Sequence, residues 1–271
     1  MTNETIADTT EQVKTMVASP LLITEIEDKY KDLLDQYPSS KDLQFRTLSN
    51  TWRELGLSAK AIGLLGLLAY WSSRLIDYDE YSVPRINPIW IARKLGYAKN
   101  QASRHTKQIQ ALLLELHHAE LIQIVPDHVT KTQTVKIINA KDQSNGYSKL
   151  YSPTIKTILE QSKDMAMLYR VAIYVAMRSI TFENTNATMT KTPTYLANML
   201  NLSVTTVQKH LAWLREHNAV CWYKLVLANE YHTVKYVYSD PVNVKDLTKW
   251  TIDHLIAKDP RLKHYITKVV A

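Results

Sequence analysis

Cysteine and glycine are scarce in this chain, and a long apolar run is absent. The single cysteine, Cys221, allows neither a disulfide framework nor a cysteine-based zinc site within one chain, which fits a reducing cytosol. Five glycines in 271 residues argue against glycine-rich nucleotide loops and many-stranded β architectures. The longest strongly apolar run, Ile62 to Trp71, is about half the length that spans a bilayer, and the polar, acidic N-terminus is unlike a signal peptide. We therefore expect a cytoplasmic protein that does not enter a membrane.

Motifs of catalysis are also missing. There is no G-x-x-x-x-G-K-[ST] loop, no H-E-x-x-H and no His-x-His, which argues against a P-loop ATPase, a zinc protease and a metal-dependent nicking enzyme. Asp77, Asp79 and Glu80 form an acidic group that could bind Mg²⁺, although an acidic loop between helices is the commoner explanation. Cys221 lies in the apolar stretch VCWY and is expected in the core rather than as a nucleophile. We predict that the chain is not an enzyme and has no catalytic residues, cofactor or metal.

Positive charge is present in excess but is unevenly distributed. The formal net charge is +7 and the isoelectric point is about 9.2. Because residues 1–45 hold nine acids and four lysines, a net of −5, the remaining 226 residues carry +12. A basic body suits a polyanionic partner, since each neutralised phosphate releases condensed counterions. A soluble basic protein without such a partner is the alternative.

The first half of the chain has the pattern of three helices followed by a hairpin. Residues 1–20 are predicted to be a disordered acidic tail, and residues 21–57 an amphipathic helix (Leu21–Tyr37) with a connection. This helix is expected to serve as a self-association or partner surface, or else to pack on the first domain. The first domain, residues 58–138, begins after a candidate N-cap at Ser58. Its predicted helices are Ala61–Leu75, Pro88–Leu95 and Asn100–His118, and its strands are Leu121–Val125 and Thr132–Ile138.

The same pattern returns after a polar linker. Residues 139–164 are predicted to be this linker, with a connecting helix at Ser152–Gln161, and residues 241–271 a C-terminal helical tail. The second domain, residues 165–240, has predicted helices at Met165–Ser179, Pro193–Leu200 and Val204–Asn218, and strands at Val220–Val226 and Thr233–Tyr238. The stretches 77–83 and 183–189 are expected to be loops. The expected fold is mainly α with small β-hairpin wings, arranged as two tandem winged helix-turn-helix domains.

The two copies align at a constant offset of 105 residues, which indicates an internal duplication. Ala92 and Ala197 are the small residues that a helix-turn-helix keeps where its third helix crosses, and Tyr97 and Leu202 fill the turn. The other matched pairs are Pro88/Pro193, Trp90/Tyr195, Ile91/Leu196, Leu95/Leu200, Arg104/Lys209, His105/His210 and Ile109/Leu214. About five extra residues are assigned to the third helix of the first copy, whose end then matches Asn218-Ala219 at His118-Ala119.

The third helix of each copy is expected to have an apolar face and a DNA-binding face. The core face has Ile109, Leu112, Leu113 and Leu116 in the first copy and Val207, Leu211 and Leu214 in the second. In helix-turn-helix proteins the N-terminal half of this helix enters the major groove, where amide, hydroxyl and cationic groups bond base edges and phosphates. The predicted DNA-binding residues are Asn100, Gln101, Arg104, Lys107, Gln108, Thr205, Thr206, Gln208 and Lys209 on the helices, and Lys131, Lys136, Lys224 and Lys235, with His232, on the hairpins.

Simpler explanations exist for several of these residues. Polar residues on a helix face are often only solvated, and lysines on a hairpin often serve to block strand pairing. His105 and His210 are expected to be structural or phosphate-facing rather than catalytic. The aromatic residues of the second hairpin, Trp222, Tyr223, Tyr236 and Tyr238, suit stacking on single-stranded bases, but alternation on a half-buried hairpin explains them more simply.

The duplicated P-x-[WY]-[IL]-A-x-x-L core within residues 58–240 resembles the tandem winged-helix replication initiators of plasmids and phages, and less closely the phage replisome-organiser proteins. The resemblance implies that both domains bind double-stranded DNA at an origin, that host replication proteins are partners, and that exchange between homodimer and monomer regulates activity. A transcriptional regulator using the same surface and a scaffold whose winged helices bind proteins are the alternatives.

Overall fold

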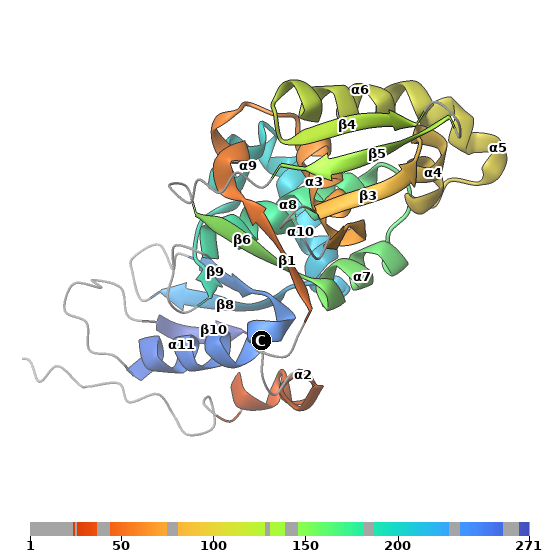
Figure 1. Cartoon of the computed structure of the whole chain (residues 1–271). Helices are drawn as coiled ribbons and strands as arrows, with labels where there is room; N and C mark the ends of the chain where they lie inside the picture. The colour runs from red at the N-terminus through yellow and green to blue at the C-terminus, as the bar shows by residue number, and fades with distance from the viewer. Residues whose placement is uncertain are drawn as a thin grey trace, which may run out of the picture.

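Helices predominate in the computed structural model, and its strands form small antiparallel sheets (Figure 1). The prediction of a mainly α protein with small β-hairpins is therefore confirmed. The structure describes residues 24, 26–36, 44–74, 81–127, 131–138, 146–181, 187–227, 234–256 and 266–270. The predicted acidic tail (residues 1–20), the acidic group Asp77, Asp79 and Glu80, and His232 lie outside this part of the chain.

The first half begins with a strand and is dominated by the apolar helix α3. Ser58 caps α3 by accepting the N–H of Ala61, as predicted, and Asn87 caps α4 by accepting the N–H of Trp90. Its elements are β1 (Phe45–Ser49), η1 (Asn50–Glu54), α3 (Ala59–Trp71), β2 (Ser73–Arg74), β3 (Tyr81–Ile86), α4 (Pro88–Lys94), α5 (Lys99–Ala102), η2 (Ser103–His105), α6 (Thr106–His118), β4 (Ile122–Asp127) and β5 (Thr132–Ile137).

The second half repeats this order. Thr192 caps α9 and Ser203 caps α10 through their side-chain oxygens. Its elements are β6 (Tyr147–Tyr151), α7 (Ser152–Gln161), α8 (Ala166–Thr181), β7 (Thr188–Met189), α9 (Pro193–Leu200), α10 (Val204–Glu216), β8 (Cys221–Leu227), β9 (Val234–Ser239), η4 (Pro241–Asn243), α11 (Val244–Ile256) and β10 (Ile266–Val270). The short helix α2 (Lys31–Gln36) precedes both halves.

In each half, a strand that precedes α4 or α9 joins the hairpin to make a larger sheet. The strand orders are β2-β3-β5-β4 and β10-β8-β9-β7, so β3 and β7 occupy equivalent places beside β5 and β9. The sequence predicted loops around both strands. This prediction was wrong for Tyr81–Val83 and Thr188–Met189, because their strand partners lie about 50 residues further along the chain.

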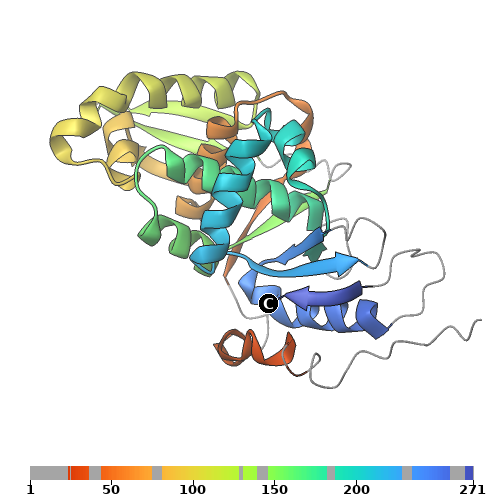
Figure 2. The ribbon, with the colours of Figure 1, turned by 180° about the vertical axis from the view of Figure 1, so that it is seen from behind.

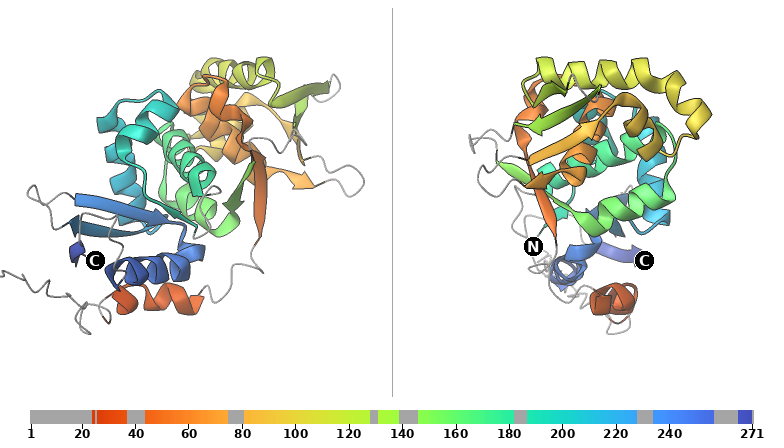
Figure 3. Two further views of the ribbon diagram at one scale, coloured as in Figure 1. Left: turned by 90° about the vertical axis from the view of Figure 1, so that its left-hand side faces the viewer. Right: turned by 45° about the vertical axis from the view of Figure 1, so that its right-hand side comes forward.

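The two halves meet across an approximate two-fold axis. Strand β1 pairs antiparallel with β6, and α3 packs on α8 (Figures 1 and 3). A Cβ added at Gly63 would lie 2.0 Å from the carbonyl oxygen of Leu168, and one at Gly66 would lie 2.9 Å from a methyl of Val171. Each of these residues therefore touches its own counterpart 105 positions later, as in an isologous dimer interface. One hydrophobic core runs through both halves.

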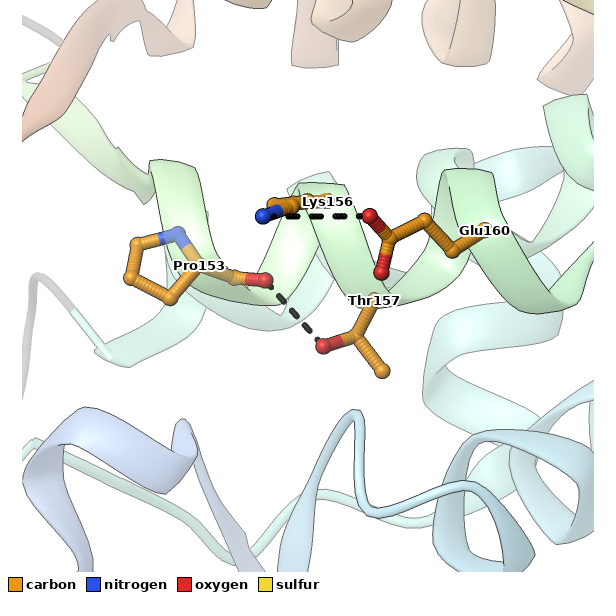
Figure 4. Close-up of polar contacts among 4 residues, drawn as sticks. All are labelled: Pro153, Lys156, Thr157 and Glu160. Atoms are coloured by element: carbon orange, nitrogen blue, oxygen red, sulfur yellow. Dashed lines mark hydrogen bonds and ion pairs between the residues drawn. The ribbon is translucent and has the colours of Figure 1, made fainter. Parts of the chain in front are cut away.

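The predicted linker, residues 139–164, includes ordered elements in its described part. Strand β6 was not predicted, whereas α7 has the predicted bounds Ser152–Gln161. Within α7, Pro153 lies in the first turn and its carbonyl accepts the hydroxyl of Thr157 at 3.2 Å, while Lys156 and Glu160 form an exposed ion pair at 3.8 Å (Figure 4). The helix therefore turns a solvated face outward and buries Ile155 and Ile158.

Both ends of the described chain pack on the second sheet. In the described part of the predicted helical tail, η4 is followed by the helix α11, Val244–Ile256. Residues 266–270 instead form β10, because this β-branched stretch completes the open edge of β8. The N-terminal segment (residues 24 and 26–36, which include α2) packs near α11 on the second half (Figure 3). It does not pack on the first domain, which was one of the two expectations.

The contacts of the N-terminal segment explain this placement. The hydroxyl of Tyr30 donates to the carbonyl of Trp222 at 2.9 Å and accepts its N–H at 2.8 Å, so it replaces a strand partner where the pairing of β10 stops. Tyr223 donates to the carbonyl of Ile26 at 2.7 Å. Ile26 and Tyr30 are buried with the outward-facing apolar side chains of β8.

Candidate nucleic-acid interface

The turn between the second and third helices has the same geometry in both copies. The N–H of Tyr97 donates to the carbonyl of Ala92 at 3.2 Å, and the N–H of Leu202 donates to that of Ala197 at 2.9 Å. Both alanines are almost completely buried. The burial predicted for both alanines is therefore confirmed, and Tyr97 and Leu202 are partly buried against the core, which is consistent with their predicted place in the turn.

The third helix of the first copy is not the continuous α-helix predicted over Asn100–His118. It consists of α5, the 3₁₀ turn η2 and α6. At the junction the hydroxyl of Thr106 donates to the carbonyl of Ser103 at 2.8 Å, a local bond of the kind that competes with the regular helical pattern. The N-terminal end of this helix is therefore a separate short segment, Lys99–His105.

The register of the two third helices differs from the predicted one. The buried positions Ile109, Leu112, Leu113 and Leu116 correspond to Val207, His210, Leu211 and Leu214, and each pair differs by 98 positions. Because α4 and α9 start 105 positions apart, the first copy has seven extra residues here rather than five. Seven residues make about two helical turns, so the apolar face stays in phase after the insertion. The predicted pairs Ile109/Leu214, Arg104/Lys209 and His105/His210 were therefore wrong, because His210 is the counterpart of Leu112.

The ends of the third helices support this register. Glu120 and Asn218, again 98 positions apart, both adopt left-handed backbone conformations, with φ of 58° and 52°. The N–H of the next residue then bonds back to Leu116 in one copy and to Leu214 in the other. The helix ends therefore match at Glu120 and Asn218, not at His118 and Asn218 as predicted.

The predicted DNA-binding residues of the third helices lie on the outer surface with one exception. Asn100, Gln101, Arg104, Lys107, Gln108, Thr205, Gln208 and Lys209 are all exposed. Thr206 is half-buried, and its hydroxyl lies 2.8 Å from the capping hydroxyl of Ser203. Thr206 therefore helps to start α10, which packs on α8 and α9 (Figure 2).

The hairpin lysines divide into two groups. Lys131 is exposed in the turn before β5, and Lys235 is exposed near the start of β9. Lys136 and Lys224 are half-buried within central strands of their sheets, with strand neighbours on both sides. Only the first two therefore extend the exposed basic surface.

The aromatic side chains of the second hairpin are occupied by the protein itself. Tyr223 and Tyr238 are buried, as alternation on the hairpin predicts. The Lys29 ammonium lies 4.0 Å from the centre of the Trp222 ring, and the Arg215 guanidinium lies 5.1 Å from it. Burial is the main reason that the pKa of Lys29 falls to about 8. These contacts favour a structural role over stacking on single-stranded bases.

His105 and His210 both stack on tyrosine rings of the protein itself. His210 is only 5% exposed and stacks on Tyr169, with ring centres 5.4 Å apart. Burial, and then the nearby charges of Arg170 and Lys209, lower the pKa of His210 to about 4. His105 stacks on Tyr97 at 3.8 Å. The sequence did not predict that His210 is buried, although His210 occupies in α10 the position that Leu112 occupies in the apolar face of α6.

No site for catalysis stands out in the part of the chain that the structure describes. Within those residues, no group of three histidine, cysteine or acidic side chains is placed to hold a metal. Cys221 is buried, and burial raises the pKa of its thiol well above its usual range. None of the described helices combines the length and apolar character needed to cross a bilayer. No protein-family model, curated protein or solved structure matches this chain.

Proposed function

We propose that each half is a winged helix-turn-helix domain and that the chain binds double-stranded DNA through both. The support is a topology that occurs twice: helix, strand, helix, helix and hairpin, with the strand β3 or β7 paired to the second hairpin strand. The observation on which the proposal depends is the exposed row of amide and cationic side chains on each third helix, above a buried apolar face.

The approximate two-fold relation between the halves gives the proposed site its symmetry. Two reading helices related by a two-fold axis meet a duplex in opposite orientations, so the DNA site has two inverted half-sites. The half-sites differ in sequence, because the first third helix has seven extra residues and presents Arg104, whereas the second presents Lys209.

The distribution of charge is consistent with this proposal. Within the second sheet, Trp222 and Tyr236 point to the side of the core beneath α10, and Tyr223 and Leu225 point to the opposite side. The N-terminal segment covers that opposite side and carries the exposed acids Glu27, Asp28, Asp32 and Asp35. Negative charge is thus separated from α10 by the sheet, which reduces repulsion of phosphates at the proposed interface.

We further propose that this DNA binding serves replication initiation of a plasmid or phage, in which two winged helices on one chain contact an origin and recruit host replication proteins. The duplicated helix-turn-helix core supports this role through its resemblance to such initiators. A transcriptional regulator would use the same surface, so the role is tested separately from the binding.

The test of DNA binding is selection of bound duplexes from a random pool. We expect a bipartite motif with two unlike inverted half-sites, and an affinity that falls about a thousand-fold between about 50 and 200 mM salt. A pool without enrichment, or a flat dependence on salt, would contradict DNA binding. For the role, a plasmid carrying the selected site is expected to replicate only when the chain is supplied. If the chain changes only transcription from that site, the regulator is correct.

A further inference from the structure

One short stretch, residues 162–170, joins α7 to the start of α8 and contacts both the turn before the first third helix and the second third helix itself. On the side of the first half, this stretch forms two hydrogen bonds with the turn after α4. The N–H of Asp164 donates to the carbonyl of Leu95 at 2.7 Å, and the N–H of Met165 donates to the hydroxyl of Tyr97 at 3.2 Å. Asp164 has a left-handed backbone with φ of 62°, a conformation that its surroundings must maintain.

The same stretch contacts the third helix of the second half. The Arg170 guanidinium lies 3.8 Å from the centre of the Trp213 ring and donates to the hydroxyl of Ser162 at 2.6 Å. One residue earlier, the ring of Tyr169 stacks on His210. Trp213 and His210 both belong to α10. The stretch therefore connects the two helices that are proposed to read DNA.

Tyr97 is the link on the side of the first half. Its ring stacks on His105 with centres 3.8 Å apart and planes 22° from parallel, and its hydroxyl accepts the N–H of Met165. The segment Lys99–His105, which begins the first third helix, buries only one side chain completely, that of Ala102. Core packing alone thus anchors this segment weakly. In the second copy the equivalent residue is Leu202, and α10 begins directly at its Ser203 cap.

We propose that Tyr97 is a positioning residue that fixes the N-terminal end of the first third helix relative to α8, and thereby sets the spacing between the two DNA-reading helices. The spacing that the protein selects between its two half-sites then depends on the hydroxyl and ring of Tyr97. The part that concerns DNA rests on the proposed function. The geometric part does not, because it concerns the distance between two helices of the free protein.

The geometric part is tested in the full chain by spin-label distances. Labels on Ser103→Cys and Gln208→Cys, both exposed positions, report the separation of the two helices, with the buried Cys221 replaced by alanine. Tyr97→Phe removes only the bond to Met165, and Tyr97→Leu also removes the stack on His105. We expect a narrow distance distribution in the parent chain, a broader or displaced one in Tyr97→Phe, and a larger change in Tyr97→Leu. An unchanged distribution in both variants overturns the proposal.

A matched control separates this effect from the general loss of a tyrosine hydroxyl. The hydroxyl of Tyr81 lies 3.4 Å from that of Thr47, and both residues belong to the first half. Tyr81→Phe is therefore expected to leave the distribution of distances between the two labels unchanged. If it broadens that distribution as much as Tyr97→Phe does, the effect is not specific to Tyr97 and the proposal is refuted.

The DNA part uses the selected duplex and a version with one base pair inserted between the half-sites, which rotates one half-site by about 35°. The parent chain is expected to lose about tenfold in affinity on insertion, and Tyr97→Phe no more than about threefold. Equal losses in the two proteins overturn the role in spacing. A parent chain that binds no duplex refutes the proposed function instead, and the spin-label distances still decide whether Tyr97 positions the helix.

Discussion

Replacing Gly63 with alanine is expected to weaken the contact between the two halves, against the usual effect of this substitution. In the middle of a helix, alanine is more favourable than glycine by about 1 kcal/mol. Here the new Cβ would lie 2.0 Å from the carbonyl oxygen of Leu168 and 2.7 Å from its carbonyl carbon, where real Cβ atoms essentially never approach within 3.0 Å. These are backbone atoms of α8, so no side-chain rotation relieves the clash, and α3 and α8 must separate by about 1 Å. Overpacking and the lost contacts cost more than the gain in helix propensity, and we expect a net loss of roughly 2–4 kcal/mol.

The assay is denaturant unfolding followed by the fluorescence of the tryptophans, which include the buried Trp52. Gly66→Ala is the matched control, because its Cβ would meet only side-chain methyls, those of Val175 and Val171 at 2.8 and 2.9 Å. These methyls can shift, so a loss of at most about 1–2 kcal/mol is expected. If Gly63→Ala is as stable as the parent chain, or more stable, the close approach of α3 and α8 and the two-fold core inferred from it are wrong.

Three further predictions concern pH, the N-terminal segment and DNA readout. The pKa of His210 is about 4 in the folded chain and 6.5 when unfolded, so above pH 6.5 it has no effect. As the pH falls from 6.5 to 4 the unfolded chain takes up the proton first, and up to about 3 kcal/mol of stability is lost. His210→Leu is expected to reduce that loss, and an unchanged pH profile of the unfolding free energy would contradict the assignment. Tyr30→Phe leaves the N–H of Trp222 without its partner, while the carbonyl of Trp222 keeps the bond from the Lys29 ammonium. We expect a cost of about 1–3 kcal/mol in the same unfolding assay; a cost near zero would show that water replaces the hydroxyl. Arg104→Ala is expected to cost about 1–3 kcal/mol on the selected duplex and to relax one base position, whereas Lys209→Ala weakens all duplexes alike and lowers the salt slope by about one unit. Equal losses on selected and scrambled duplexes would make Arg104 a phosphate contact.

The structure also changes an expectation based on charge alone. Because residues 1–45 have a net charge of −5, their removal would be expected to leave DNA affinity intact or to raise it. Ile26 and Tyr30 are buried against the second sheet, and β1 begins at Phe45. Removing residues 1–45 therefore deletes part of the core, and the effect on DNA binding cannot be separated from loss of folding by that truncation.

Local sequence was sufficient for the main helices, the hairpins and the duplication. Helix caps and apolar periodicity act within one or two turns, so Ser58, the face Ile109–Leu116 and the bounds of α7 and α9 could be predicted. The exposed side chains of the third helices followed from the same periodicity, because the residues outside an apolar face point to solvent. The repeat at an offset of 105 was visible because the second helix and the turn keep their core residues in both copies.

Tertiary structure alone decided the features that depend on distant partners. The strands β1, β3, β6, β7 and β10 are short, and each acquires its identity by pairing with a segment far along the chain. The two-fold contact at Gly63 depends on the approach of two backbones, which no local pattern records. The sequence identifies Tyr97 as an apolar residue that fills the turn. Only the folded chain brings its hydroxyl to Met165 and its ring to His105. The reason is physical: periodicity reports which side of an element is buried, but not which element buries it.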